Sequence, residues 1–385
     1  MKNLYKVFFA VFAFIFFFNS VSTQKTFAKE TSNEISAESY VLIDENSGKI
    51  LEERDADKKL PMASITKVQT LNVIFDEINA GTMKLDDEVI ISSHAARQTG
   101  SEAFLDENKS YKIEDLIKTV IISSANDSAV ALAEASAGTE ERFVEKMNKL
   151  AKNMKITSTH FANATGLPVP DHYSTALDIA KMFQKLVKND TYLKYSKIWM
   201  DELMHSKGRK TELVNTNRLL KTMTECDAGK TGYTSEAKYC LVARAKRGNM
   251  SLIAVVLGCP DSKVRFADAK TLFNIGFTNY EINEIIVAGT EYGKVKVLGG
   301  RQNTIIAISS RGFTGIRRKG ENSHYTTNVK LDLFAKAPIQ KGDKLGQIEV
   351  IDESGNVIDM IDLVASDNVD KIKFGDIFKR INNNW

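Results

Sequence analysis

The spacing of apolar residues changes near residue 280 of this 385-residue chain, and that change most limits the folds open to it. Before it, helical patterns such as "IEDLIKTVIISS" stand between strand-like runs such as "SLIAVVLG". After it come short segments in which apolar and polar residues alternate, among them "NTIIAISS", "LGQIEVID" and "VIDMIDLVA". The pattern predicts a mixed domain followed by an all-β domain, with a boundary between residues 275 and 285.

The first part of the chain begins and ends with strand patterns. Residues 39–56, "SYVLIDENSGKILEERDA", predict two strands around a turn, and strands return after residue 225. Between them we expect helices at 63–79, from residue 113, from an N-cap at Asp127 to a stop at Gly138, and over "EERFVEKMNKLAKNM". A last helix is expected to end near Gly276. This order favours an α+β fold, in which an antiparallel sheet built from both ends of the domain packs against a helical cluster.

The first 28 residues have the pattern of a secretory signal peptide. Lys2 and Lys6 precede the apolar run "VFFAVFAFIFFF", and the small residues of "TFA" end at Ala28. This run fits a secretory apolar region and falls short of the roughly 20 residues needed to span a bilayer. The alternative is an uncleaved anchor. We expect an exported chain that begins near Lys29 after cleavage.

Composition argues against several classes of function. The chain has 52 basic and 49 acidic residues and a net charge of +3, which gives no electrostatic case for binding nucleic acid. Cys226, Cys240 and Cys259 are odd in number and lack a C-x-x-C spacing, so free, mostly buried thiols are expected, with a Cys226–Cys240 pair as the alternative. The histidines have no metal-ligand spacing, and no metal site is predicted.

Residues 61–70, "PMASITKVQT", place Ser64 and Lys67 three positions apart at the start of a predicted helix. Side chains at i and i+3 share one helix face, so the lysine amine can reach the serine hydroxyl. A neutral lysine can act as the base that makes a serine nucleophilic, and burial near positive charge favours the neutral form. The alternative is an ordinary helix start, with Lys67 in solvent.

Two further motifs support the catalytic interpretation through their order. Ser124-Ala125-Asn126 falls at a break between two predicted helices, and Lys230-Thr231-Gly232 is expected to begin a strand of the closing sheet. Each motif alone is weak, since the chain has another S-x-x-K at 235–238 and further S-x-N triplets at 354–356 and 366–368. The order and context of the three motifs together point to a serine acyl-transfer site.

This ordered set resembles that of the penicillin-binding serine enzymes. Longer segments, such as "ISSANDSAVALAE" and "NATGLPVPDHYSTALDIAKM", are similar to the D-alanyl-D-alanine carboxypeptidase family of low-molecular-mass penicillin-binding proteins. "GKTGYTSEAKYCLVARAKRGNMSLIAVVLG" extends that similarity, and "APIQKGDKLGQIEV" is similar to the family's C-terminal β-domain. The resemblance implies a penicillin-binding, β-lactamase-like domain at 29–280 and a small all-β domain at 281–365.

The resemblance also implies an activity and its partners. The expected enzyme removes the terminal D-alanine from peptidoglycan muramyl pentapeptides and is inhibited covalently by β-lactam antibiotics. It needs no cofactor. It works outside the cell, at the outer face of the cytoplasmic membrane or in the cell wall.

The resemblance assigns a role to each motif residue. Ser64 is expected to be the nucleophile and Lys67 its base, while Ser124 relays a proton to the leaving D-alanine. Asn126 holds the substrate amide, and Lys230 provides positive charge for the substrate carboxylate and helps to keep Lys67 neutral. Thr231 and Thr234 add hydroxyl donors, and Gly232 lets the substrate backbone lie against the strand edge. The backbone N–H groups of Ser64 and of a residue just after Gly232 are expected to form the oxyanion hole.

Two positions leave the binding of the substrate carboxylate open. Tyr233 departs from the family pattern, because some relatives have histidine there. Arg218, in "NTNRLL", is a candidate helper for the carboxylate, with an ordinary surface arginine as the alternative.

The last residues, 366–385, are expected to associate with a membrane surface. Phe374, Ile377, Phe378, Ile381 and Trp385 lie at the offsets of one helical stripe, which is too short to span a bilayer but suits its interface. The family resemblance implies an amphipathic anchor of this kind. The alternative is a stripe that packs on the β-domain or frays.

Two other functions compete with the carboxypeptidase. A serine β-lactamase of class A uses an extra glutamate between the second and third motifs, but this chain has no glutamate from residue 146 to 201. A catalytically silent wall-binding protein is the non-enzymatic alternative, and the presence of all the reactive side chains argues against it.

Overall fold

The computed structural model describes residues 34–321 and 325–375. The predicted signal peptide and the tail stripe from Ile377 onward lie outside the described residues. Among the helices of the described ranges, none is both long enough and apolar enough to cross a membrane.

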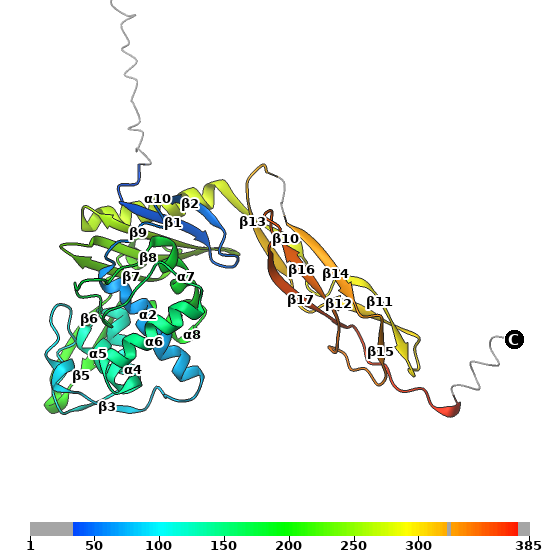
Figure 1. Cartoon of the computed structure of the whole chain (residues 1–385), viewed down its shortest axis with the longest axis horizontal. Helices are drawn as coiled ribbons and strands as arrows, with labels where there is room; N and C mark the ends of the chain where they lie inside the picture. The colour runs from blue at the N-terminus through cyan, green and yellow to red at the C-terminus, as the bar shows by residue number, and fades with distance from the viewer. Residues whose placement is uncertain (1–33, 322–324, 376–385) are drawn as a thin grey trace, which may run out of the picture. The chain divides into compact units, whose positions relative to one another are not determined.

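An antiparallel sheet of five strands forms the frame of the N-terminal domain (Figure 1). Its order is β2-β1-β9-β8-β7, so strands from both ends of this domain lie side by side. The predicted α+β class is confirmed. The strands are β1 (Ser39–Asp44), β2 (Ile50–Arg54), β7 (Cys226–Thr234), β8 (Lys238–Arg247) and β9 (Met250–Cys259).

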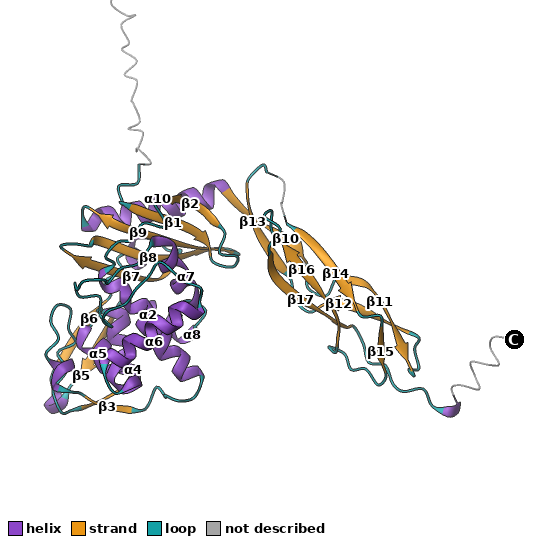
Figure 2. Cartoon of the chain, in the orientation of Figure 1, coloured by secondary structure: helices purple, strands orange, loops and turns teal. Residues whose placement is uncertain are grey.

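Both faces of this sheet are buried. Ile43 and Val255 belong to the core shared with the helical cluster, whereas Leu42 and Val256 belong to the core under α10 (Ser262–Asn279). Figure 2 shows α10 on one side of the sheet and the other labelled helices on the opposite side. Because successive strand residues face opposite sides, a sheet covered on both faces requires continuous apolar strands. The run "LIAVVLG" in β9 meets that requirement.

The helical cluster lies in the chain between β2 and β7, together with two small antiparallel strand pairs, β3 with β4 and β5 with β6. Its helices are η1 (Ala63–Thr66), α2 (Lys67–Asn79), α3 (Ser93–Ala96), α4 (Ile113–Ile122), α5 (Asn126–Ala137), α6 (Glu140–Asn153), α7 (Ala176–Leu186), α8 (Asp190–Ser196), η2 (Ser206–Gly208) and α9 (Leu219–Thr222). Its strands are β3 (Glu88–Ile90), β4 (Ser110–Lys112), β5 (Met200–Met204) and β6 (Lys210–Val214).

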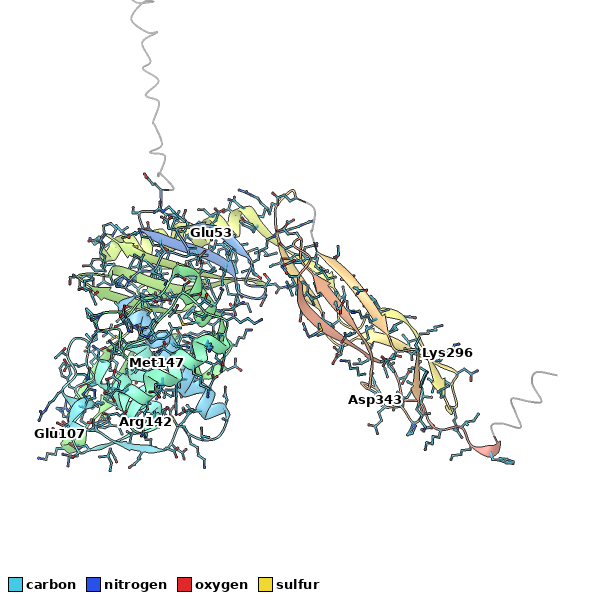
Figure 3. The ribbon with its side chains drawn as sticks, viewed as in Figure 1. Glu53, Glu107, Arg142, Met147, Lys296 and Asp343 are labelled. Atoms are coloured by element: carbon cyan, nitrogen blue, oxygen red, sulfur yellow. The ribbon has the colours of Figure 1, made fainter. Side chains whose placement is uncertain are left out.

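Helix α2 is the central element of the cluster and packs against α5, α6 and α7. Several polar side chains in its first half are also buried, and Gln69 and Thr70 among them bond neighbouring backbone. Gln69 Nε2 donates to the carbonyl of Met147 at 3.1 Å, and the Thr70 hydroxyl donates to the carbonyl of Ala164 at 2.7 Å. Met147, labelled in Figure 3, is itself fully buried on α6. The helix that follows the Ser64 turn is therefore held on several sides.

The start of α5 differs from the prediction. Asp127 is not the N-cap, because the helix already begins at Asn126. The carboxylate of Asp127 instead accepts hydrogen bonds from the backbone N–H groups of Ala103, at 3.0 Å, and Leu105, at 3.1 Å. Gly138 ends the helix as predicted, with a positive φ of 83°.

The last helix of the domain is longer than predicted. It continues through Gly276 to Asn279. A Cβ at position 276 would lie 2.5 Å from Leu252 Cδ1 and 3.0 Å from Leu42 Cδ2. This glycine therefore permits close packing of α10 on the sheet and does not stop the helix.

Between α10 and residue 365 the described chain is all β, as predicted. β10 pairs with β13, and six strands form a sheet of order β14-β16-β17-β12-β11-β15. Alternate residues such as Val295, Ile305, Ile348 and Leu363 form its buried core. The strands are β10 (Tyr280–Ile286), β11 (Glu291–Leu298), β12 (Thr304–Ser309), β13 (Phe313–Arg318), β14 (Thr326–Leu331), β15 (Phe334–Lys336), β16 (Lys344–Ile351) and β17 (Val357–Ala365).

Candidate active site

Ser64 lies where a 3-10 turn runs into α2. The helix predicted over 63–79 is present, but its first four residues form the separate turn η1. Ser64 is half-buried, and its Oγ lies 3.0 Å from Lys67 Nζ. The pair expected from the i, i+3 spacing is therefore within hydrogen-bond distance.

Lys67 is fully buried and has three hydrogen-bond partners. Besides Ser64 Oγ, these are Asn126 Oδ1 at 2.6 Å and the carbonyl oxygen of Thr165 at 2.8 Å. Both of these oxygens only accept, so a neutral amine uses its two N–H groups on them and turns its lone pair toward the Ser64 hydroxyl. Burial lowers the pKa of Lys67 to about 7, against the opposing charge of Asp127. This geometry suits a base.

The carbonyl that holds Lys67 belongs to residues 163–166, which we call the strap. Asn163 Oδ1 accepts hydrogen bonds from the N–H groups of Thr165 and Gly166, at 3.1 and 2.7 Å. Gly166 has a φ of +87°, and a Cβ there would lie 1.9 Å from the carbonyl oxygen of Ala63. The strap is therefore pressed against the turn that carries Ser64, at a point where only glycine fits.

Ser124 and Asn126 lie at the break between α4 and α5, as predicted. Ser124 has a φ of +65°, a conformation that is strained for a residue with a side chain. Its Oγ accepts a hydrogen bond from Lys230 Nζ at 2.6 Å. The Asn126 amide donates to the carbonyl of Thr99 at 2.5 Å, which orients its oxygen toward Lys67.

The third motif lies within β7, which is an edge strand of the sheet. Lys230, Thr231 and Gly232 are in the middle of this strand, so the prediction that they begin it is wrong. A Cβ at Gly232 would lie 2.7 Å from the carbonyl oxygen of Met62 and 3.2 Å from Ser64 N. The absence of a side chain at 232 therefore lets β7 approach the Ser64 turn.

Lys230 is buried, and its amine bonds Ser124 Oγ and the carbonyl of Thr231 at 3.0 Å. Burial, followed by the positive charges of Lys67 and Arg265, lowers the pKa of Lys230 well below its ordinary value. An anion beside these groups would be strongly favoured, because it would relieve their mutual repulsion.

Ser64, Ser124 and Asn126 line one cavity of about 310 Å³. Lys67 and Lys230 are not part of the lining, but each bonds a serine that is. Hydroxyl groups, glycines and one guanidinium dominate its lining. Its lining residues are Ser64, Gly100, Ser101, Ser124, Asn126, Gly166, Leu167, Thr216, Thr231, Gly232, Tyr233, Thr234 and Arg265.

Comparison with known proteins gives the site its context. Residues 24–261 match the D-alanyl-D-alanine carboxypeptidase family (peptidase S11), and residues 280–371 match the family described as penicillin-binding protein 5, C-terminal domain. The chain belongs to the D-alanyl-D-alanine carboxypeptidase family.

Individual members of the D-alanyl-D-alanine carboxypeptidase family resemble this chain along most of its length. D-alanyl-D-alanine carboxypeptidase DacF of Bacillus subtilis is 37% identical over 365 residues, which cover 93% of this chain and 94% of DacF. DacC of Escherichia coli is 33% identical, over 96% of this chain and 92% of DacC. The crystal structure of penicillin-binding protein 5 from Haemophilus influenzae aligns with a TM-score of 0.69 and 33% identity, over 88% of this chain and 98% of that one.

Sequence reasoning missed Arg265 as a site residue of this carboxypeptidase. It lies on the first turn of α10, is buried, and lines the cavity. One of its nitrogens donates to the carbonyl of Gly232 at 3.0 Å, while its buried Nε has no hydrogen-bond partner among the described residues. The one available signal is a charged residue inside the otherwise apolar stretch "VRFA", which is equally typical of a surface helix.

The two positions left open by the sequence differ in their surroundings. Tyr233 lines the cavity, is 56% exposed and stacks on Tyr239 at 4.4 Å between ring centroids. Arg218 is exposed at the start of α9 and is not part of the lining, whereas Thr216 is, and its hydroxyl bonds that of Thr231 at 2.8 Å. Thr234 lines the cavity and also accepts a hydrogen bond from Ala237 N in the following turn.

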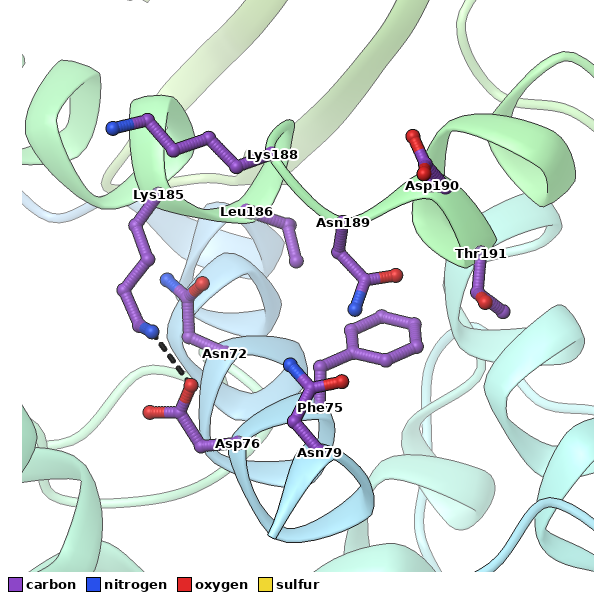
Figure 4. A pocket seen from close by; sticks show the side chains of 10 residues that line it. All are labelled: Asn72, Phe75, Asp76, Asn79, Lys185, Leu186, Lys188, Asn189, Asp190 and Thr191. Atoms are coloured by element: carbon purple, nitrogen blue, oxygen red, sulfur yellow. Dashed lines mark hydrogen bonds and ion pairs between the residues drawn. The ribbon is translucent and has the colours of Figure 1, made fainter. Parts of the chain in front are cut away.

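A second groove, of about 420 Å³, lies between α2 and the α7–α8 connection (Figure 4). Its Lys185 pairs with the carboxylate of Asp76 at 2.6 Å. Amide groups of Asn72, Asn79 and Asn189 make up much of the remaining lining. This groove has no hydroxyl bonded to an amine, so it offers no counterpart to the Ser64–Lys67 pair.

Proposed function

We propose that this chain performs the D-alanyl-D-alanine carboxypeptidase reaction of its family through an acyl-enzyme on Ser64. The observation that carries the proposal is the set of three contacts made by the buried Lys67 amine. Two acceptor oxygens occupy its N–H groups and leave the lone pair toward the hydroxyl of Ser64. An alcohol needs such a base to attack an amide at neutral pH.

In the first step the Ser64 oxygen attacks the carbonyl carbon of the peptide bond between the two D-alanines. Lys67 takes the hydroxyl proton, and the N–H groups of Ser64 and Tyr233 are proposed to stabilise the oxyanion. The C–N bond then breaks. Ser124 relays a proton to the departing amine, and Lys230, bonded to Ser124 Oγ, supports that relay. Water then hydrolyses the ester and frees Ser64.

We assign binding of the terminal carboxylate to the cationic end of the cavity. Lys230 and Arg265 provide positive charge there, and Thr231 provides a hydroxyl. The unpartnered Nε of Arg265 gives a buried donor that a carboxylate can satisfy. Asn126 is assigned to the substrate amide, and Gly232 and Thr234 to the peptide backbone that continues along the β7 edge.

A β-lactamase is the nearest rival function. It shares the acylation chemistry but needs a base that activates the deacylating water. Among the described residues that line the cavity, none carries a carboxylate. This lining favours slow hydrolysis of a penicilloyl-enzyme and argues against rapid penicillin turnover.

The test uses both substrates on one preparation. We expect release of free D-alanine from a pentapeptide ending in D-Ala-D-Ala, and a long-lived covalent adduct with fluorescent penicillin. Ser64→Ala should abolish both signals. Rapid penicillin turnover without D-alanine release would favour the lactamase, and absence of both reactions in the wild type would favour a silent wall-binding protein.

The location of the enzyme and its segments is also a proposal. We propose a signal peptide at 1–28, a penicillin-binding domain at 29–280, a β-domain at 281–365 and a membrane-associating tail at 366–385. Support comes from the apolar run at 7–18 and from the apolar stripe that starts at Phe374, which is 77% exposed. The full chain should sediment with anionic vesicles, and a chain truncated after residue 368 should not.

A further inference from the structure

Glu140, on the first turn of α6, is a largely buried carboxylate that the proposed mechanism does not use. Its side chain is 14% exposed, and its two oxygens have different partners. Oε1 accepts a hydrogen bond from the backbone N–H of Ala164 at 2.9 Å, and Oε2 lies 2.9 Å from His94 Nε2 on α3. One carboxylate thus joins two segments that are far apart in the sequence.

The first of these segments is the strap, which lies directly behind the base. Ala164 precedes Thr165, whose carbonyl accepts a hydrogen bond from Lys67 Nζ. The carbonyl of Ala164 accepts from the Thr70 hydroxyl. Glu140 therefore holds the N–H of Ala164, the residue next to the one whose carbonyl holds Lys67.

The second segment leads to the other partner of Lys67. Helix α3 continues into residues 97–101, where the carbonyls of Thr99 and Ser101 accept hydrogen bonds from the side chain and the backbone N–H of Asn126. Asn126 Oδ1 in turn accepts from Lys67 Nζ. These contacts, together with the chain segment 94–101, form a closed ring that runs from Lys67 through Asn126, residues 101–94, Glu140 and the strap back to Lys67.

We infer that Glu140, together with His94, is a positioning residue for the base. By tying the strap to α3, it fixes the two acceptor oxygens that orient the Lys67 lone pair toward Ser64. The inference rests on the proposed role of Lys67. A displacement of about 1 Å at reacting atoms can cost about a hundredfold in rate, so a constraint at this distance can matter although it touches no substrate.

The charges around this contact indicate which form of His94 takes part. Its ring faces carboxylates of α5 and α6, namely Glu134, Glu140 and Glu141. The hydrogen bond to Glu140, and then the charges of all three carboxylates, raise the pKa of His94 above its usual range against partial burial. The protonated ring donates to Glu140, and a neutral ring can still do so through Nε2–H.

The experiment measures penicillin acylation of the full chain as a function of penicillin concentration. For Glu140→Ala we expect the maximal acylation rate to fall by about ten- to a hundredfold, with the half-saturating concentration changed less than about threefold. The matched control is Glu141→Ala, which removes the neighbouring exposed carboxylate and should acylate like the wild type. A normal rate in Glu140→Ala, or a defect confined to the half-saturating concentration, would overturn the inference.

The pH dependence of acylation by Glu140→Gln tests the inference in a way that does not depend on how stably a variant folds. The amide oxygen of the glutamine can still accept from Ala164, but its NH₂ faces His94 Nε2, which can accept only while the ring is neutral. We therefore expect the ratio of the Glu140→Gln rate to the wild-type rate to approach one at pH values above the pKa of His94. At lower pH this ratio should decrease. A ratio that stays constant with pH would contradict the inference, including when Glu140→Ala fails to fold.

Lys67→Ala in the same assay separates the two proposals. Normal acylation by Lys67→Ala would refute Lys67 as the base and with it the proposed mechanism. Loss of acylation by Lys67→Ala, combined with unchanged rates in both Glu140 variants, would refute the positioning role alone.

Discussion

The two domains differ in how many polar side chains they bury. The N-terminal domain buries lysines, amides, hydroxyls and carboxylates, among them Lys67, Asn126, Asp127 and Lys230. In the described part of the β-domain, Ser309 is the only buried polar side chain, and it braces a turn by donating to the carbonyl of Val287 at 2.7 Å. Burying a polar group lowers the stability of the fold unless the group is hydrogen-bonded, so buried polar groups indicate where this chain has a role for them other than stability. Several of the buried polar groups of the N-terminal domain lie around Ser64, among them Lys67, Asn126 and Ser124.

The comparison predicts that the largest effects on acylation come from the backbone around the buried polar groups. Gly166→Ala should reduce acylation at least about a hundredfold, because a Cβ would overlap the Ala63 carbonyl and push the strap away from the Ser64 turn. Gly320→Ala is the matched control, since Gly320 also has a positive φ but has open space around its Cβ position. Acylation by Gly166→Ala as fast as that by Gly320→Ala would contradict this prediction.

The pH dependence of acylation should be the next largest effect. Burial lowers the pKa of Lys67 to about 7, and only the neutral amine is a base. The acylation rate should therefore rise with pH through about 7 and fall about tenfold for each unit below it. Rates measured from pH 5 to 9 check this expectation. A profile that is flat between pH 5 and 7 would remove Lys67 as the group that limits acylation.

The smallest effect on acylation should come from the core of the β-domain. Ile348→Ala removes a fully buried side chain and should lower the stability of that domain by about 2–5 kcal/mol while acylation at 25 °C stays unchanged. Thermal unfolding and fluorescent penicillin labelling of one sample measure both quantities. Lys344→Ala, which breaks an exposed ion pair with Asp362, serves as the control and should change neither measurably. A large loss of acylation in Ile348→Ala would show that the core of the β-domain supports the active site.

The same contrast explains how far the sequence could predict the structure. In the β-domain, alternation alone indicated the strands, because a side chain either faces the apolar core or does not. In the N-terminal domain the i, i+3 spacing correctly predicted that Ser64 and Lys67 lie within hydrogen-bond distance. The hydrogen bond between Lys230 and Ser124 was not predicted and is a finding of the structure.

What escaped prediction was backbone chemistry and long-range packing. The Thr165 carbonyl has no side-chain signature, since every residue carries the same group. Asp127 has the pattern of an N-cap, yet it bonds distant N–H groups that no local rule can locate. Gly276 was interpreted as a helix stop because the sequence does not show that the sheet lies close beside it. Arg265 enters the cavity only through the crossing of α10 over the sheet.

The pairing of β1 with β9 also determines when this domain can finish folding. Tyr40 pairs with Val256, so the partner strand of β1 lies about 200 residues further along the chain. On the proposed export route, β1 and β2 therefore cross the membrane long before β9, and one side of β1 stays without its partner strand until β9 follows. The lysine-bearing edge strand β7 also precedes β9 in the chain, so a complete cleft forms late, close to the end of export of this domain.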